Sequence, residues 1–445
     1  MLGDLDAAYR ELLGELFAAR RAGVVFGLER MREILARLGH PERRLGAIVH
    51  VAGTNGKGST AAMIRAMARA HGRRVGQYTS PHLCCVRERI VDDDGWVDRA
   101  RFVDAAAEVR AAGGAALTFF EQLTAIALVA LARRPLDLTV LEVGLGGRLD
   151  ATNVVEGALA VVTGVALDHE AMLGPTLGEI AAEKAGIFRR GQPAILGLGG
   201  EPEAVPELLR LARAAGATPI EVVTAEALAE VPPLALRGAY QRRNAATALA
   251  AVRALVRAGV LPDDEAARRR GLLDVVHPGR LELVAATPRV LLDGAHNPAG
   301  AVALAAELPA LPAPRVLILA VSADKDAAAI ARPLLPHVSL VIATAYQQER
   351  SLPAGRLAQV VREAVARASD RDGGGDGAAV PAVPEVPEVI EAPDLVTALG
   401  RARALLGASA SVVIAGSLFL VGEARAHLLD VEVDPLPLSD PSARR

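Results

Sequence analysis

The chain has 445 residues, of which 51% are hydrophobic and 3% aromatic, and its formal net charge is −3. Domains cluster at roughly 100–200 residues, so this length predicts two domains with sizeable cores. The small net charge gives no electrostatic reason to expect nucleic acid or an anionic membrane as a partner.

Three features of the sequence bear on the cellular compartment of the protein. It begins MLGDLDAAYRELL, with two early acids and without the basic-then-apolar layout of a signal peptide. No uncharged apolar run reaches the ~18–20 residues that a membrane span needs. The only cysteines, Cys84 and Cys85, are adjacent, which is a poor arrangement for a disulfide between them. We therefore expect a reduced, cytoplasmic, soluble protein, and a monomer.

Strands and helices alternate through the first part of the chain. Short apolar runs bounded by turn residues indicate buried strands, and longer periodic segments between them indicate helices. Strands are predicted at residues 47–52, 74–78, 138–143 and 158–165, and helices at residues 59–70, 119–133, 177–189 and about 240–258. This alternation predicts an α/β fold with a doubly wound, mostly parallel sheet covered by helices on both faces.

A second alternation follows a predicted hinge at residues 277–280. Its strands are predicted at residues 290–293, 315–321, 340–343 and 411–415, with helices from Ala299 and Lys325 and a closing helix. This pattern indicates a smaller Rossmann-like domain. We expect an N-terminal domain at residues 1–280, a C-terminal domain at 281–430, a flexible Gly- and Pro-rich insertion at 370–394 and a tail at 431–445.

The stretch HVAGTNGKGST, residues 50–60, has most parts of a phosphate-binding loop but breaks the usual spacing. Against the common pattern G-x-x-x-x-G-K-[ST], Val51 replaces the first glycine and Gly58 replaces the hydroxyl residue after Lys57. The predicted strand before the loop and helix after it favour phosphate binding, because backbone N–H groups and a helix N-terminus converge there. The alternative is a tight turn in which Ser59 is only the N-cap of the helix.

Two further clusters follow predicted strands, where open α/β sheets bind ligands. Ser80 can supply the Mg²⁺-binding hydroxyl that the glycine loop lacks, although an ordinary Ser-Pro turn is the alternative. Glu142 ends a hydrophobic strand, and a carboxylate buried there needs a partner such as Mg²⁺. The alternative is a capped glycine turn in which Arg148 and Asp150 pair at the surface.

Three clusters are less decisive by themselves. His169 follows a predicted strand, but a lone histidine is more often structural and oxygen ligands prevail around Mg²⁺. Lys184 beside Glu183 on a predicted helix usually indicates a solvated face. Asp, His and Asn crowd into residues 293–298 at a strand-to-helix turn, which indicates a ligand site. With Arg280 in the hinge, this cluster suggests a second domain that closes onto a nucleotide.

In combination these residues resemble the folylpolyglutamate synthase/dihydrofolate synthase family, within the Mur ligase superfamily. The resemblance extends over residues 23–426 and is most specific at residues 53–59, 142–153, 167–186 and 293–298. It implies a P-loop domain like the Mur ligase central domain, with a pterin-side pocket, and a C-terminal domain that closes over ATP and binds glutamate. In the implied reaction ATP phosphorylates a carboxylate, and the amine of L-glutamate attacks the acyl phosphate.

The resemblance assigns roles residue by residue. It implies nucleotide contacts at Gly53, Thr54, Asn55, Gly56, Lys57, Gly58, Ser59, Asn244, Arg280 and Asp293. It implies magnesium ligands, for two ions, that include Ser80, Glu142 and His169. It implies catalytic roles for Lys57, Lys184 and His296, with a carbamate on Lys184. It implies substrate contacts at Phe26, Phe120, Glu121, Leu149, Asp150, Ala151 and Ser417.

The resemblance leaves the substrate range open. A bifunctional enzyme that uses dihydropteroate and reduced folates is favoured by the turn at residues 79–83, by Phe120 and Glu121, and by residues 147–150. The first alternative is a synthase that uses reduced folates alone. A cell-wall Mur ligase fits less well, because only about 46 residues precede the strand before the loop. A non-catalytic nucleotide-binding regulator is the remote alternative.

Overall fold

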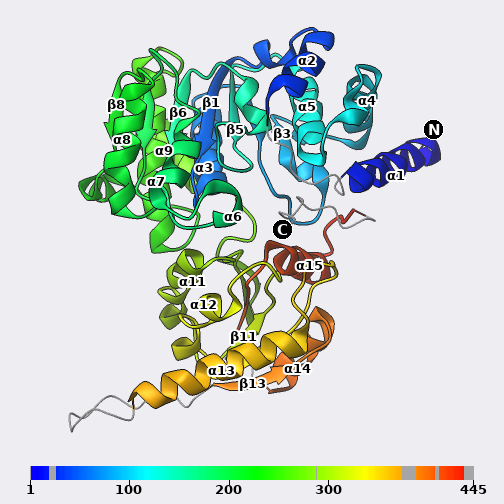
Figure 1. Cartoon of the computed structure of the whole chain (residues 1–445), viewed down its shortest axis with the longest axis vertical. Coiled ribbons are helices and arrows are strands. Elements are labelled where there is room, and N and C mark those ends of the chain that lie inside the picture. The colour runs from blue at the N-terminus through cyan, green and yellow to red at the C-terminus, as the bar shows by residue number, and fades with distance from the viewer. Residues whose placement is uncertain (1, 20–26, 287, 373–386, 406–409, 435–445) are drawn as a thin grey trace. The chain divides into compact units, whose positions relative to one another are not determined.

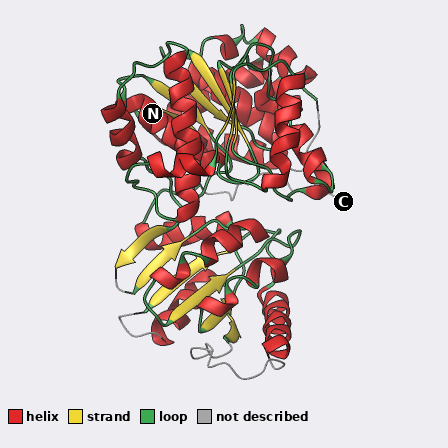
Figure 2. Ribbon diagram, turned by 90° about the vertical axis from the view of Figure 1, so that its left-hand side faces the viewer, coloured by secondary structure: helices red, strands yellow, loops and turns green. Residues whose placement is uncertain are grey.

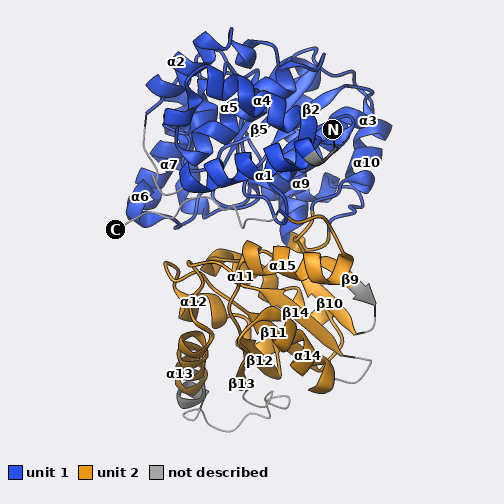
Figure 3. Cartoon of the chain, turned by 90° about the vertical axis from the view of Figure 1, so that its right-hand side faces the viewer, with its two compact units in different colours: residues 1–236, 240–277, 434–445 blue, residues 237–239, 278–433 orange. Residues whose placement is uncertain are grey.

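The computed structural model describes residues 2–19, 27–286, 288–372, 387–405 and 410–434. The chain forms two compact units (Figures 1 and 3). Unit 1 comprises residues 1–236, 240–277 and 434–445, and unit 2 comprises residues 237–239 and 278–433. The chain therefore passes between the units more than once, and Asp434 belongs to unit 1 although it directly follows unit 2.

Unit 1 contains an eight-stranded sheet in the order β4-β3-β2-β5-β1-β6-β7-β8. Its strands are β1 Ala47–Ala52, β2 Val75–Tyr78, β3 Ile90–Asp92, β4 Gly95–Trp96, β5 Leu138–Glu142, β6 Leu159–Val162, β7 Ala194–Leu196 and β8 Ile220–Val222. The strands from β2 to β8 in this order pair in parallel, whereas β3 pairs antiparallel with β2 and β4. The predicted doubly wound parallel sheet is confirmed.

Helices cover both faces of this sheet (Figure 2). They are α1 Leu2–Ala19, α2 Glu29–Arg37, α3 Lys57–Ala70, α4 Arg99–Ala111, α5 Phe119–Ala132, α6 Glu170–Leu173, α7 Leu177–Ala185, α8 Val205–Ala214, α9 Ala239–Arg257 and α10 Glu265–Asp274. Neighbouring residues of β1 enter different cores: Ile48 packs with α1, α2, α4 and α5, whereas Val49 packs with α3, α9 and α10. Burial on both faces explains why the central strands are apolar throughout.

The N-terminus of helix α5 is determined by its local sequence. Thr118 is its N-cap, and the Glu121 carboxylate accepts a hydrogen bond from the Thr118 N–H at 2.8 Å. The Thr118 hydroxyl oxygen accepts a hydrogen bond from the Glu121 N–H at 3.4 Å, which completes a capping box. The helix that follows is buried on nearly every side, as its apolar sequence predicts.

Unit 2 contains a six-stranded sheet in the order β13-β12-β11-β14-β10-β9, and only β9 runs antiparallel to its neighbour. Its strands are β9 Glu282–Ala286, β10 Arg289–Leu292, β11 Arg315–Leu319, β12 Leu340–Ala343, β13 Glu388–Glu391 and β14 Ser411–Ala415. Its helices are α11 Pro298–Ala305, α12 Ala327–Ala331, α13 Ala354–Asp372, α14 Leu395–Leu405 and α15 Leu418–Leu429. The predicted Rossmann-like alternation is present.

The predicted insertion at residues 370–394 is too long at both ends. Helix α13 extends to Asp372, and β13 is an edge strand paired with β12. Residues 373–386 lie outside the described residues. The strand was missed because Glu388–Glu391 is short, half-exposed and preceded by Pro-rich sequence, which hides its alternation.

Within the described parts of the chain, no helix is long and apolar enough to cross a membrane.

Candidate active site

The glycine loop connects β1 to α3 and takes backbone conformations that side chains disfavour. Gly53 has φ +147° and Gly56 has φ +83°. A Cβ atom would lie 1.9 Å from Thr163 Oγ1 at the first position and 2.3 Å from Asn244 Oδ1 at the second. Both positions therefore require glycine, and the loop keeps its backbone close to its neighbours. Gly56 is the N-cap of α3, so the alternative in which Ser59 caps this helix is wrong.

The unusual glycine after Lys57 also has a steric cause. A Cβ on Gly58 would lie 3.0 Å from Cε1 and Nε2 of His277 and 3.5 Å from Oε2 of Glu142. The imidazole therefore crowds the place where the common motif carries a side chain. The hydroxyl of the next residue, Ser59, is buried and accepts a hydrogen bond from Gln241 Nε2 at 3.2 Å.

Lys57 folds back over its own loop. Its Nζ donates hydrogen bonds to the carbonyl oxygens of Gly53 at 3.1 Å and Thr54 at 3.2 Å. The ammonium group is half-buried at the N-terminus of α3, where the helix dipole favours an anion. A cation beside glycine-rich backbone at a helix start is the chemistry that a phosphate chain requires.

Lys184, in α7, is buried with 3% of its surface exposed, so its assignment to a solvated face was wrong. Burial and then the nearby charge of Lys57 lower its pKa to about 7. The adjacent Glu183 instead pairs with Arg148 at 2.7 Å, so the alternative in which Arg148 and Asp150 pair at the surface is wrong. Helix α7 thus turns Lys184 toward the glycine loop, whereas Glu183 forms the ion pair with Arg148.

Glu142 ends β5 and is 4% exposed, as its position after a hydrophobic strand predicts. Its Oε2 accepts a hydrogen bond from the backbone N–H of Ser80 at 3.2 Å, so the structure brings these two residues together. The Ser80 hydroxyl and the Glu142 carboxylate are hard oxygen donors of the kind that Mg²⁺ prefers, and they fit such an ion. No group of three His, Cys, Asp or Glu residues suited to a metal is found among the described residues.

His169 lies after β6, beside the strand that carries the glycine loop. It has φ +54° and immediately precedes α6. Its backbone N–H donates to Asp168 Oδ1 at 2.9 Å, and its Nε2 lies 3.9 Å from the same oxygen. The glycine loop, Glu142 and His169 thus follow the three neighbouring strands β1, β5 and β6, at the edge where open α/β sheets bind ligands.

Asn244 in α9 is 5% exposed, and its Nδ2 donates to Gln241 Oε1 at 2.9 Å. Its Oδ1 lies against Gly56, as the Cβ distance above shows, so α9 contributes to the wall of the glycine loop. Sequence reasoning missed Gln241, His277 and Thr163 in this wall. Their places depend on contacts between distant segments, for which the local sequence carries no signal.

The predicted pterin-side residues gather around the start of α5. The Phe120 ring lies 6.2 Å from the Tyr78 ring, centroid to centroid, and fills the space beside Gly144. Arg30 Nη2 donates to both carboxylate oxygens of Glu121, at 3.0 and 2.9 Å. Phe26 lies outside the described residues.

Asp150 is buried next to this cluster, between the half-exposed Leu149 and the buried Ala151. Its carboxylate accepts hydrogen bonds from the N–H groups of Gly144 at 3.0 Å and Leu145 at 2.9 Å, and from the N–H and hydroxyl of Thr152 at 3.0 and 2.6 Å. Burial raises the pKa of Asp150, and the hydrogen bonds act against that rise. Asp150 thus fixes the loop after β5 from inside.

In unit 2 the predicted residues Asp293, His296 and Ser417 follow β10 and β14, and Arg280 precedes β9. Asp293 is 4% exposed and accepts hydrogen bonds from the N–H groups of Leu281 and Ala295, both at 2.9 Å. The Arg280 guanidinium lies against Gly294, where a Cβ would be 2.0 Å from Nη1. His296 Nδ1 lies 2.7 Å from the carbonyl oxygen of Gly294.

Ser417 is the buried N-cap of α15, and its hydroxyl oxygen accepts from Phe419 N–H at 3.1 Å. It also hydrogen-bonds the Tyr346 hydroxyl, which lies 2.7 Å from Ser322 Oγ. Burial raises the pKa of Tyr346. Because β10 and β14 are parallel neighbours, Asp293 and Ser417 lie at the same edge of the unit 2 sheet.

Comparisons with known proteins decide the family. The family model described as Mur ligase, glutamate ligase domain matches residues 279–418. A dihydrofolate synthase/folylpolyglutamate synthase of Bacillus subtilis is 37% identical over 67% of this chain and 75% of its own length. The structure of Escherichia coli FolC in complex with DHPP and ADP superposes with a TM-score of 0.80 at 32% identity, covering 94% of this chain and 97% of that one. The chain belongs to the folylpolyglutamate synthase/dihydrofolate synthase family.

Another relative is longer than this chain. A probable bifunctional folylpolyglutamate synthase/dihydropteroate synthase of Haloferax volcanii is 36% identical over 94% of this chain, which spans 50% of that protein. The Mycobacterium tuberculosis folylpolyglutamate synthase complexed with ADP superposes with a TM-score of 0.80 at 31% identity, covering 94% of this chain and 99% of that one. The predicted resemblance to this family, and the predicted fold, are thus confirmed.

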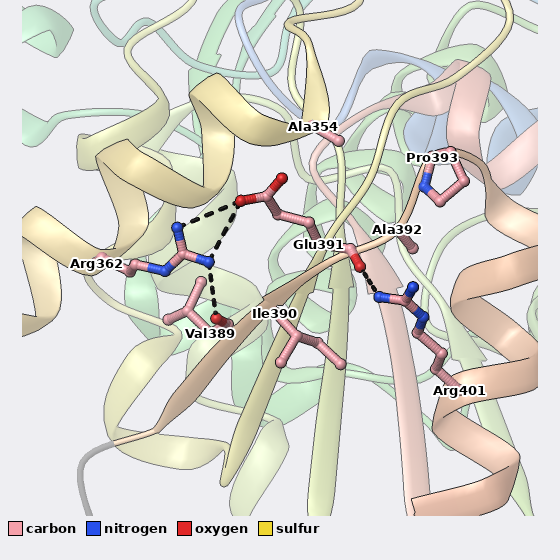
Figure 4. Close-up of a pocket in the computed structure, with 8 residues that line it drawn as sticks. All are labelled: Ala354, Arg362, Val389, Ile390, Glu391, Ala392, Pro393 and Arg401. Atoms are coloured by element: carbon pink, nitrogen blue, oxygen red, sulfur yellow. Dashed lines mark hydrogen bonds and ion pairs between the residues drawn. The ribbon is translucent and has the colours of Figure 1, made fainter.

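A pocket of about 480 Å³ in unit 2 contains none of the residues that the resemblance assigns (Figure 4). Its charged groups bind one another: Arg362 pairs with Glu391 at 3.3 Å, and Arg401 donates to the carbonyl oxygen of Glu391. The other lining residues are Ala354, Val389, Ile390, Ala392 and Pro393. Since both ion-pair partners are about half exposed, these contacts have the character of a solvated surface pair.

Proposed function

We propose that the chain is an ATP-dependent ligase that joins L-glutamate to dihydropteroate and to the γ-carboxyl group of reduced folates. One observation carries the proposal: Lys184 is buried, with 3% of its surface exposed, near the charge of Lys57 in the glycine loop, and burial and then this charge lower the pKa of Lys184. Two lysines held close together and partly desolvated are costly unless an anion shares their site. A phosphate chain and a phosphorylated carboxylate are such anions.

The reaction balances in two steps. A carboxylate oxygen of the folate substrate attacks the γ-phosphorus of ATP, and ADP leaves. The amine of glutamate then attacks the acyl carbon, the C–O bond to phosphate breaks, and the amine loses a proton as the amide forms. Negative charge develops on the transferring phosphoryl group, so fixed positive groups accelerate the first step.

Each side chain has a proposed task in this sequence. Lys57 and the loop residues 53–59 bind the ATP phosphates, with Asn244 against the loop. Ser80, Glu142 and His169 would hold magnesium. Bound Mg²⁺ would neutralise phosphate charge and orient the reacting oxygens. Arg280 and Asp293 contact the nucleotide, and His296 and Ser417 position the glutamate or the phosphoryl group.

We further propose that Lys184 carries a carbamate. Only the neutral amine has the lone pair that adds to CO₂, and a pKa of about 7 makes this form abundant near neutral pH. Modification would turn a buried cation into an anion beside Lys57, which removes the repulsion between the two lysines. The modified group would then hold a second magnesium ion or orient the acyl phosphate.

Use of dihydropteroate is the finer part of the proposal. Phe120 offers a flat apolar surface, and Glu121 is held by Arg30 and Thr118 at the start of α5. A flat ring with N–H donors matches an aromatic surface beside carboxylates. A synthase that uses reduced folates alone is the alternative.

The test is phosphate release from MgATP with L-glutamate, with dihydropteroate in one assay and tetrahydrofolate in another. Turnover with both substrates, abolished by Lys57→Ala, supports the bifunctional proposal. Turnover with tetrahydrofolate alone would restrict the function to polyglutamylation. No turnover with either, despite bound ATP, would overturn the ligase proposal and favour a nucleotide-binding regulator.

A further inference from the structure

Asp434 is buried although it lies in the predicted tail, and it follows Val433, the last residue of unit 2. Only 7% of its surface is exposed. Its Oδ1 accepts hydrogen bonds from Tyr9 Oη at 2.6 Å and from Cys85 Sγ at 3.4 Å, and its Oδ2 accepts from Val86 N–H at 2.6 Å. Its own N–H donates to the carbonyl oxygen of Cys84 at 3.0 Å.

These contacts join three segments of unit 1 that are far apart in sequence. Tyr9 lies in α1 and is 2% exposed, and Cys85 is fully buried. Burial and the Asp434 carboxylate both raise the pKa of the Tyr9 hydroxyl, so the phenol keeps its proton and donates it. A buried carboxylate requires such donors, and here side chains and backbone supply them together.

Apart from Tyr9, the residues that Asp434 binds belong to a loop that also reaches the candidate active site. We call residues 80–89 the Ser80 loop. Glu88 organises its middle by accepting hydrogen bonds from the N–H groups of Leu83, Cys84 and Cys85, each at 2.9 Å. At its start, the Ser80 N–H donates to Glu142 at 3.2 Å.

The far end of the Ser80 loop packs against the start of α5. Arg89 is 1% exposed, its Nε donates to His82 Nδ1 at 2.9 Å, and its guanidinium lies 5.6 Å from the centre of the Phe119 ring. Phe119 directly precedes Phe120 and Glu121. One loop therefore connects the Asp434 carboxylate to both the proposed magnesium ligands and the proposed pterin-side residues.

We propose that Asp434 is a positioning residue of the ligase: it ties α1 to the middle of the Ser80 loop, whose far end packs on Phe119, and thereby holds the start of α5 in place for the acyl substrate. This inference rests on the proposed function. The glycine loop makes none of the contacts described for Asp434, so binding of the nucleotide alone should not depend on it. The expected signature is a selective loss of affinity for dihydropteroate.

The test compares Asp434→Asn and Tyr9→Phe with Asp430→Asn. Asp430 is exposed at the end of α15 with φ +50°, a conformation that asparagine tolerates, so it is a matched control. Loss of a charged acceptor should raise the KM for dihydropteroate on the order of tenfold, with the KM for MgATP within about twofold of the parent. Asp430→Asn should change neither, and Asp434→Glu should restore part of the affinity.

A second measurement, which needs no enzyme activity, tests the inference independently of the proposed function. Amide hydrogen exchange at Val86 should accelerate in Asp434→Asn and stay unchanged in Asp430→Asn, whether or not the chain turns over substrate. Lower thermal stability with unchanged KM values would reduce Asp434 to a structural residue and overturn the inference. If the parent protein turns over neither dihydropteroate nor tetrahydrofolate, the proposed function fails. Unaltered exchange at Val86 in Asp434→Asn would refute the role of Asp434 in holding the Ser80 loop, whatever the activity. Tyr9→Phe, which removes a single hydroxyl, repeats the test if Asp434→Asn does not fold.

Discussion

The imidazole of His277 lies against Gly58 and crowds the space in which a side chain at position 58 would stand. This relationship explains why the loop departs from the common phosphate-binding motif. A helix normally tolerates any small residue at such a position, but here a Cβ would be 3.0 Å from two ring atoms. Glycine is therefore favoured at this position by a residue more than two hundred positions away, which the loop sequence does not reveal.

We predict that Gly58→Ala weakens ADP binding. Forcing a methyl group against the His277 ring costs about 1–3 kcal/mol through displaced packing, which corresponds to a loss of roughly 5- to 150-fold in affinity if the displacement falls on the loop. Calorimetric titration with ADP measures the loss. Gly178→Ala in α7 is the matched control, because its Cβ would only touch Thr176 Oγ1, at 4.0 Å.

The double variant Gly58→Ala/His277→Ala tests whether a clash between the new methyl group and the His277 ring causes the loss of ADP affinity. Removing the ring should restore most of the lost affinity, so that the two substitutions are strongly non-additive. Additive losses would show that the ring does not exclude the methyl group.

For Lys184 we predict a carbamate whose amount rises with pH. The folded-state pKa is lowered to about 7, so the neutral amine that reacts with CO₂ grows from a minor to a major fraction between about pH 6 and pH 8. Carbon-13 NMR with labelled bicarbonate should show a carbamate signal that follows this rise and is missing in Lys184→Arg.

Lys57→Ala supplies a reciprocal check that needs no enzyme activity. Removing the charge of Lys57 should let the pKa of Lys184 rise, because repulsion from Lys57 is one of the causes that lower it. The carbamate should then form at higher pH than in the parent protein. A carbamate signal with the same pH dependence in both proteins would contradict the coupling.

Local sequence determined most of the fold but only part of the site. Periodicity and strand-end positions predicted the central strands of both sheets and placed Glu142 correctly, because those signals are local, whereas the short strands β3, β4, β7, β8, β9 and β13 were missed. The burial of Lys184 was not predictable from its helix, where a neighbouring glutamate indicates a solvated face. Asp434 shows the limit most clearly: its partner Tyr9 is 425 positions away, and one of several acids in a Pro-rich C-terminal stretch carries no sign of burial.

The carboxylate of Glu121 should matter for dihydropteroate more than for ATP. Glu121→Gln weakens the contact with Arg30 and one hydrogen bond of the capping box, so the start of α5 loses part of its support. We expect the KM for dihydropteroate to rise on the order of tenfold and the KM for MgATP to stay within about twofold. Glu33→Gln, which affects the exposed pair with Arg37, is the control and should change neither value.

His50 should make the protein sensitive to mild acid. Its ring is buried in β1, where Nε2 lies 2.9 Å from Thr152 Oγ1, and burial followed by the charge of Arg189 lowers its pKa to about 3. Above about pH 6.5 the ring is neutral in both the folded and the unfolded chain and contributes no pH dependence. Between about pH 6.5 and pH 3 only the unfolded chain binds the proton, so the free energy of unfolding falls as the pH falls, by up to about 1.4 kcal/mol per pH unit.

Chemical denaturation of the parent protein and of His50→Gln, from about pH 7.5 to pH 4.5, measures this contribution. The glutamine has no proton to gain, and its side chain is long enough to reach the Thr152 hydroxyl. The variant should be somewhat less stable at neutral pH because the ring is lost from the core, yet its stability should fall less steeply with acid. Parallel curves for the two proteins would mean that His50 takes up its proton in the folded state with a pKa close to that in the unfolded chain, which would contradict the prediction.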